Sequence, residues 1–78
     1  MMPISPAQCR AGRALVAMDQ ITLAKAASIT RNVIISFERG RTTPNRNNLA
    51  AIRRALEDAG VEFLDGPRPG VRLRDGAV

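Results

Sequence analysis

Residues 20–41, QITLAKAASITRNVIISFERGR, constrain the fold more than any other part of the chain. Ser28-Ile29-Thr30 interrupts this stretch, and Ser and Thr favour turns and helix N-caps because their side chains compete for backbone hydrogen bonds. We expect Thr30 to be the N-cap of a helix over residues 31–39, with Gly40 as the first residue beyond it. The stretch therefore predicts two short helices joined by a tight turn.

The apolar residues of these two helices are spaced so that they can pack together. Ile34 and Phe37 lie three residues apart, which places them on one face of the second helix. We expect that face to pack against Leu23 and Ala27 of the first helix. The polar residues left on the outer face of the second helix are Arg31, Asn32 and Ser36. Two helices, a short turn and a polar outer face on the second helix are the parts of a DNA-reading helix-turn-helix.

The same stretch resembles the helix-turn-helix of the Cro/phage-repressor superfamily, also called the XRE family. The resemblance rests on Gln20-x-x-Leu23-Ala24, Ile29, Ile34 and Phe37-Glu38-Arg39-Gly40. It covers roughly residues 5 to 60 and implies a mainly α, lambda-repressor-like domain of four to five helices. The family's turn Gly is Ser28 here, so this residue must adopt a left-handed or bridge conformation. Asp19 replaces the usual Ser or Thr before Gln20, and Asp is also a good N-cap.

Length and composition limit the other classes of protein. Seventy-eight residues make one small domain with a small core. The chain has one Cys and no His, which excludes a disulfide framework or a Cys/His zinc site within one chain. We expect Cys9 to be a buried or half-buried small apolar residue, and we expect no metal and no other cofactor.

The N-terminal sequence MMPISPAQCR lacks the apolar run of a signal peptide. No stretch approaches the roughly 20 apolar residues of a membrane span. We therefore expect a soluble, cytoplasmic protein with no membrane partner.

Positive charge is concentrated in the middle of the chain. The whole sequence has 12 basic and 7 acidic residues. Between Lys25 and Arg54 there are seven basic side chains and one acidic side chain, Glu38, a net charge of +6. This basic region coincides with the second helix and the loop after it, as phosphate binding would require. A solvated basic face is the simpler alternative.

A helix is predicted before the helix-turn-helix. Ser5 is a suitable N-cap, Pro6 suits the first helical position and Gln8 completes a capping box. This helix is expected to run to about Met18. Its candidate inner residues are Cys9 or Leu15, Val16 and Met18. Arg10 and Arg13 share an outer face, where they either remain solvated or contact phosphates.

A polar loop and a further helix are predicted after Gly40. Asn45 is the preferred N-cap of this helix, with Asn47 as an alternative. The expected apolar stripe consists of Leu49, Ile52, Leu56 and Ala59. Gly60 ends the helix. The resemblance implies that the helix closes the core and that the loop lies along the DNA backbone.

The C-terminal segment predicts a short β-hairpin. Val61-Glu62-Phe63-Leu64 and Val71-Arg72-Leu73-Arg74 alternate in polarity, and residues 65–70 consist of turn-forming types. Val61 and Phe63 should face the same way as Val71 and Leu73. An isolated hairpin is marginal in water, so it should pair across a two-fold axis in a dimer or fold back on its own core. A frayed tail after Gly66 is the third alternative.

These patterns define the expected DNA contacts. Arg31 is expected to contact guanine and Asn32 adenine, with Ser36 as a weaker base reader. Ile35 could contact a thymine methyl group, pack under the following loop or touch a partner subunit. The resemblance implies that Gln20 binds phosphate or braces the recognition helix, whereas Glu38 is expected to pair with Arg10, Arg13 or Arg41. The full expected DNA-binding set is Gln20, Thr30, Arg31, Asn32, Ile35, Ser36, Arg39, Arg41, Thr43, Arg46 and Asn47.

The sequence thus predicts a helix-turn-helix DNA-binding domain over residues 1–60. A hairpin or tail over residues 61–78 is a candidate dimerisation element. The expected function is a sequence-specific double-stranded DNA-binding transcriptional regulator, a repressor or autoregulator that binds an inverted repeat as a homodimer. The alternative is an antitoxin or anti-activator that binds another protein through the hairpin. No small-molecule ligand is expected. The absence of His and Tyr also argues against an enzyme.

Overall fold

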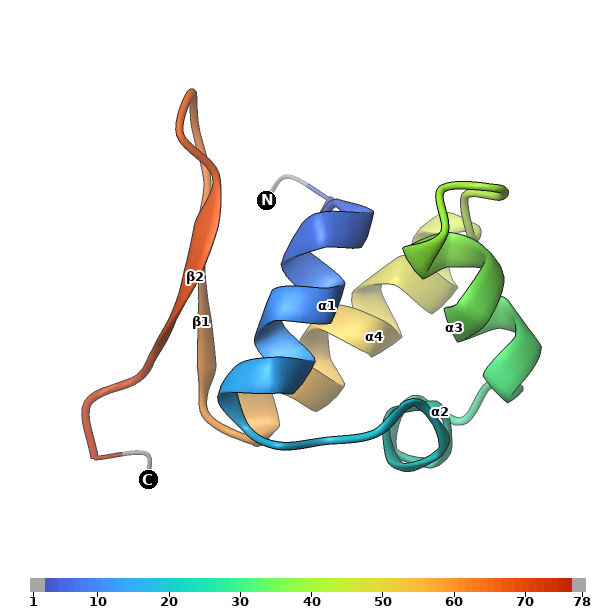
Figure 1. Ribbon diagram of the computed structural model, residues 1–78, viewed down its shortest axis with the longest axis horizontal. Coiled ribbons are helices and arrows are strands. Elements are labelled where there is room, and N and C mark those ends of the chain that lie inside the picture. The colour runs from blue at the N-terminus through green and yellow to red at the C-terminus, as the bar shows by residue number, and fades with distance from the viewer. Residues whose placement is uncertain (1–2, 77–78) are drawn as a thin grey trace.

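Four helices and a β-hairpin follow one another along the chain in the computed structural model, which describes residues 3–76 (Figure 1). The elements are α1 (Pro6–Leu15), α2 (Gln20–Ala27), α3 (Arg31–Glu38), α4 (Arg46–Asp58), β1 (Val61–Leu64) and β2 (Gly70–Leu73). This arrangement confirms the predicted mainly α fold with a C-terminal hairpin. The ends of the two predicted units, residues 1–2 and 77–78, lie outside the described residues. Within residues 3–76, no helix is long and apolar enough to cross a bilayer.

Side chains cap the N-termini of three helices as the sequence predicts. The Ser5 hydroxyl accepts a hydrogen bond from the Gln8 backbone N–H, and the Gln8 side chain accepts one from the Ser5 N–H, which completes the capping box. Asp19 caps α2 through the Thr22 N–H at 2.7 Å. Asn45 caps α4 through the Asn48 N–H at 2.8 Å, so Asn45 rather than Asn47 begins this helix.

The first three helices end in the same backbone conformation. A left-handed residue follows each helix, namely Ala17 (φ 52°), Ser28 (φ 57°) and Gly40 (φ 71°). The amide after each of them bonds back to the carbonyl five residues earlier; Met18 N–H, for example, reaches Arg13 O at 2.9 Å. Of the left-handed and bridge conformations expected for Ser28, the structure has the left-handed one. The prediction that α1 runs to about Met18 was wrong, because the left-handed Ala17 stops the helix after Leu15.

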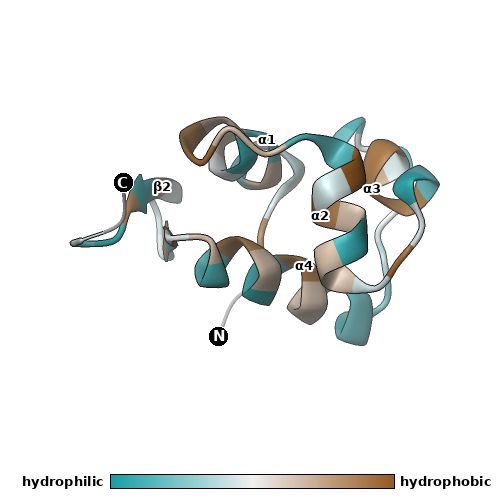
Figure 2. Cartoon of the chain, turned by 90° about the horizontal axis from the view of Figure 1, so that it is seen from below, coloured by the Kyte–Doolittle hydropathy of each residue, from teal (hydrophilic) through white to brown (hydrophobic). Residues whose placement is uncertain are grey.

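Residues from all four helices and from β1 form the hydrophobic core. Its fully buried members are Cys9, Leu23, Ile34, Ile52, Leu56 and Val61. Figure 2 shows teal and brown alternating along α4, as expected for a helix with one apolar face. Of the alternatives Cys9 and Leu15 on α1, Cys9 is the inner residue, whereas Leu15 is 40% exposed. The inner position predicted for Ala59 was wrong, because Ala59 lies exposed after the last turn of α4.

The hairpin packs beside α1, on the opposite side of that helix from α3 (Figure 1). Its register pairs Val61 with Leu73 and Phe63 with Val71, which confirms that these four residues face the same side. Gly12 lies where α1 contacts the hairpin, because a Cβ built there would be in ordinary van der Waals contact, at 3.5 Å, with both Val61 and Leu56. The alternative in which the hairpin folds back on its own core therefore holds for β1.

The left-handed Ser28 gives a stability prediction. Ser28→Gly should raise the free energy of unfolding by about 0.5–1 kcal/mol, because glycine adopts a positive φ without steric cost. The matched control is Ala50→Gly, at an exposed position within α4, which should lower it by about 1 kcal/mol. Urea unfolding measures both changes. A loss of stability in Ser28→Gly would contradict the strain argument.

Candidate nucleic-acid interface

The outer side of α3 carries the residues predicted to read bases. Arg31 and Asn32 are exposed in its first turn, and Arg39 is exposed at its C-terminal end. Ile35 and Ser36 lie half-buried between them. Arg31, Ile35 and Arg39 follow one another at steps of four residues, so α3 presents a continuous stripe that is polar at both ends. Ile35 and Ser36 are less accessible than the sequence predicted.

The start of α3 is open to solvent. Thr30 is its N-cap, as predicted, yet the Thr30 side chain makes no capping hydrogen bond. The Thr30 backbone carbonyl instead accepts from the Val33 N–H at 3.2 Å. The first turn of α3 therefore presents the exposed Thr30 hydroxyl beside the side chains of Arg31 and Asn32.

The loop between α3 and α4 adds exposed polar groups at the other end of α3. Its N–H groups at Arg41 and Thr42 bond to the Ser36 carbonyl, at 2.9 and 3.5 Å, which holds the loop against the end of the helix. The four predicted contact residues in this region are all exposed: Arg41, Thr43, Arg46 and Asn47. The predicted set thus lies along α3 and around both of its ends, with the exception of Gln20.

A buried carboxylate fixes the position of α3. Glu38, 4% exposed, accepts two hydrogen bonds from the Arg13 guanidinium, Nε to Oε2 and Nη2 to Oε1, both at 2.7 Å. The Gln20 amide donates to Oε1 at 3.0 Å, and the Cys9 thiol donates to Oε2 at 3.1 Å. Arg13 and Cys9 belong to α1 and Gln20 begins α2, so this one side chain connects three helices.

These contacts decide several sequence predictions. Glu38 pairs with Arg13, one of its three predicted partners. Gln20 is half-buried and braces α3 through Glu38, which is the second of its two predicted roles. The alternative prediction that Arg10 and Arg13 are merely solvated was wrong. Besides the Arg13 contacts, Arg10 donates to the Glu38 backbone carbonyl and thereby holds the C-terminal end of α3.

The electrostatics of this cluster favour an ionised Glu38. Burial opposes the charge and is the largest single influence, but the hydrogen bonds from Arg13, Gln20 and Cys9 together outweigh it and lower the pKa of Glu38. The pKa of the Cys9 thiol is raised, first by burial and then by its hydrogen bond to Glu38. Cys9 is fully buried, as predicted, and acts as a hydrogen-bond donor within the core.

One arginine of the predicted basic region does not belong to the exposed surface. Arg53 is 8% exposed, pairs with Glu57 at 3.1 Å and stacks over the Phe63 ring at 5.1 Å. It therefore joins α4 to the hairpin, whereas the sequence assigned it to the basic face. The basic side chains of this region that remain exposed are Lys25, Arg31, Arg39, Arg41, Arg46 and Arg54.

A solved structure has the same architecture. No family model and no curated protein matches the sequence. The solution structure of the DNA-binding domain of the P22 c2 repressor, residues 1–76, matches with a TM-score of 0.64. The two sequences are 31% identical over 73% of this chain and 76% of the repressor domain. This chain belongs to the phage-repressor family of helix-turn-helix domains. Family membership confirms the phage-repressor part of the resemblance that residues 20–41 suggested.

The Glu38 cluster predicts how stability depends on pH. Glu38→Gln should lower the free energy of unfolding by about 2–3 kcal/mol at neutral pH, because Arg13 loses its charged partner. The folded-state pKa of Glu38 lies below its unfolded value, so the carboxylate stabilises the fold above about pH 4.3 and this contribution is lost as the pH falls through the folded pKa. The wild type should therefore lose more stability in acid than the variant.

Urea unfolding at neutral and acidic pH measures both effects. Glu62→Gln is the matched control, because the Glu62–Arg72 pair is exposed and should contribute little. Equal acid sensitivity of the wild type and Glu38→Gln would show that Glu38 is not a stabilising carboxylate.

Proposed function

We propose that this domain binds double-stranded DNA sequence-specifically and regulates transcription as a repressor or autoregulator. The observation that carries this proposal is the set of exposed polar side chains at both ends of α3, in a chain 31% identical to a repressor DNA-binding domain. The N-terminal residues of a recognition helix enter the major groove first. Arg31 and Asn32 occupy that end of α3, and their side chains are the types that pair with guanine and adenine edges.

The surrounding residues suit contacts with the DNA backbone. Arg41 and Arg46 flank the loop after α3, and Arg39 ends the helix itself. The exposed hydroxyl groups of Thr30 and Thr43 are further donors to phosphate oxygens. Such contacts set the register of the protein on the duplex, while the two residues of the first turn supply base discrimination. Gln20 is assigned a bracing role, since its amide is bound to Glu38.

We further propose that this small domain, with its single recognition helix, belongs to the Cro/XRE branch of the family and is a cytoplasmic DNA-binding protein without enzymatic activity. It binds an inverted repeat as a homodimer, because a two-fold symmetric pair of recognition helices requires two-fold symmetric half-sites.

One observation also favours a protein-binding module as a second function: β2 ends in Leu73, which is 39% exposed.

Footprinting on the DNA upstream of the gene tests base reading. The wild type should protect a two-fold symmetric site, and Arg31→Ala/Asn32→Ala should lose at least about tenfold in affinity for it, because each bidentate contact contributes about 1–3 kcal/mol. Arg68→Ala, an exposed arginine in the hairpin turn, is the control and should bind as the wild type does. Diffuse coverage that is the same for the wild type and the double variant would contradict base reading.

The salt dependence of binding tests the backbone contacts separately. Arg46→Gln should lower the slope of log affinity against log salt concentration by about 0.9, the value for one lost phosphate contact, and should weaken binding to all sequences alike. Fluorescence anisotropy with specific and unrelated duplexes measures this slope. An unchanged slope would remove Arg46 from the phosphate-binding set.

A further inference from the structure

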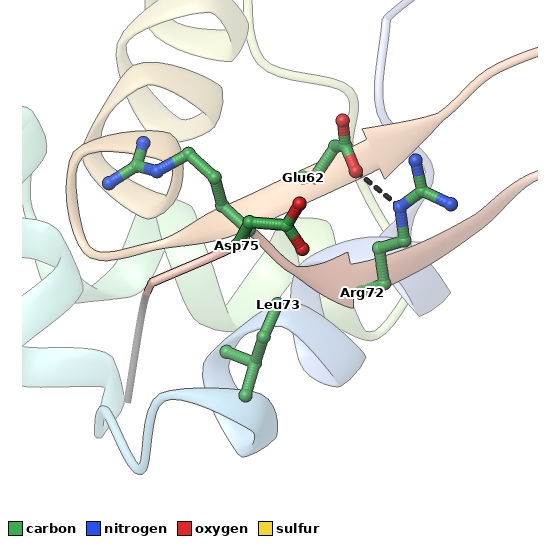
Figure 3. A pocket seen from close by; sticks show the side chains of 5 residues that line it. Glu62, Arg72, Leu73 and Asp75 are labelled. Atoms are coloured by element: carbon green, nitrogen blue, oxygen red, sulfur yellow. Dashed lines mark hydrogen bonds and ion pairs between the residues drawn. The ribbon is translucent and has the colours of Figure 1, made fainter.

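The inner face of the hairpin, which carries Val61, Phe63, Val71 and Leu73, is covered by the core on β1 and open to solvent on β2. On β1, Val61 is 2% exposed and Phe63 is 6% exposed. On β2, their cross-strand partners are more accessible: Val71 is half-buried and Leu73 is 39% exposed. Figure 3 shows the Leu73 side chain leaving the strand on the side opposite the Glu62–Arg72 ion pair. The core therefore covers β1 and leaves apolar surface along β2.

The backbone of β2 is also open along its outer edge. Arg74 N–H bonds to Gly60 O at 2.8 Å, which makes this a hydrogen-bonded position of the antiparallel ladder. Such positions alternate with non-bonded ones, so Val71 and Leu73 are non-bonded and direct their N–H and C=O groups away from β1. Within residues 3–76 the sheet has two strands, and Arg72, Leu73 and Arg74 are exposed. This edge is an unpaired template for another strand.

The hairpin is held in place rather than frayed. The Gln8 side-chain amide donates to the carbonyls of Leu64 and Gly70, at 3.2 and 3.1 Å, and so fixes the turn end of both strands to α1. At the other end, the Arg74 guanidinium donates to the Glu57 carbonyl of α4 at 3.0 Å. A strand that is already ordered loses little conformational entropy when a partner pairs with it.

We propose that the β2 edges of two copies of this chain pair antiparallel about Val71 and form a four-stranded sheet across a two-fold axis. This inference rests on the homodimer of the proposed function and specifies its interface. The backbone donors and acceptors of the β2 edge match those of a second copy in this register. Each Val71 faces its counterpart, and the outward N–H of Leu73 donates to the carbonyl of Pro69 in the second copy. Pro69, which lacks an N–H, then needs only to accept.

Within the residues of β2, charge favours this register over its neighbours. A two-fold axis perpendicular to the sheet leaves the inner faces of both hairpins on the same side of the four-stranded sheet. Each inner-facing residue then pairs with an inner-facing residue of the second copy, so the axis must pass between two copies of the same residue. Pairing about Arg72 would place the two Arg72 side chains opposite each other, and pairing about Leu73 would oppose Arg72 and Arg74; like charges in such positions are destabilising. Pairing about Val71 places Arg72 opposite Gly70, which has no side chain. Its like-charged pair, Arg68 and Arg74, lies beyond both ends of β2.

The same register covers the apolar surface that β2 leaves open. Val71 packs against its counterpart and Leu73 packs against Pro69 of the second copy, all on the inner face. Leu15, at the end of α1, is a second exposed large apolar residue, at 40% exposure. Leu15 and Leu73 are two of the three large apolar residues exposed within residues 3–76.

Sedimentation equilibrium tests this interface. The wild type should be a dimer, and Leu73→Lys should weaken dimerisation at least about tenfold, because it places a charge in the pair with Pro69. Val71→Pro should act similarly, since it removes an outward N–H and leaves the ladder to β1 intact. The matched control is Ile21→Lys, which changes the third exposed apolar residue, on α2, and should dimerise as the wild type does. Circular dichroism confirms that each variant is folded.

The outcomes separate this inference from the proposed function. A monomeric wild type, or a dimer unaffected by Leu73→Lys, would overturn the interface even if footprinting shows specific DNA protection. A dimer that forms through the hairpin but protects no specific DNA site would support the interface and contradict the proposed regulatory function. If the wild type is monomeric but its exposed β2 edge captures an alternately apolar and acidic peptide such as VEVEV, the edge serves a different protein and the inference fails.

Discussion

The buried ion pair between Glu38 and Arg13 is the interaction on which the rest of the structure depends. An eight-residue helix such as α3 is too short to be stable alone, so tertiary contacts must hold it. Apolar packing through Ile34 and Phe37 attaches α3 to the core but resists rotation poorly, because it is not directional. The paired hydrogen bonds from Arg13 and the bond from Gln20 are directional, so they fix the face that α3 turns to solvent.

Helix α1 links the two surfaces to which we assign function. Cys9 and Arg13, four residues apart, face Glu38 and therefore α3. Gln8 and Gly12, also four residues apart, face the hairpin, one by hydrogen bonds and the other by close approach. In Figure 1 the hairpin and α3 accordingly lie on opposite sides of α1. A strand that pairs with β2 therefore leaves the outer side of α3 free for DNA.

Local signals in the sequence were sufficient for most of the fold. The caps at Ser5, Asp19 and Asn45 and the common facing of the hairpin's apolar residues depend on neighbouring residues and were predicted correctly. Ser28 adopts the left-handed one of its two predicted conformations. The errors concern long-range contacts. Charge counting assigned Arg53 to a basic face, but Asp65 and Phe63, ten or more residues away, help to bury it. The first helix was predicted to run to about Met18, because nothing local indicates that Ala17 turns the chain. The predicted DNA contacts remain proposals, although the structure does gather most of them around α3.

The Glu38 cluster is expected to present the outer side of α3 to DNA, while the hairpin stays clear of the DNA. Titration of duplex DNA from upstream of the gene into ¹⁵N-labelled protein, followed by amide chemical shifts, shows which residues the DNA contacts. The largest shifts are expected at Arg31, Asn32 and residues 41–47, with the amides of β1 and β2 almost unchanged. Shifts concentrated in the hairpin, with α3 unaffected, would contradict this expectation.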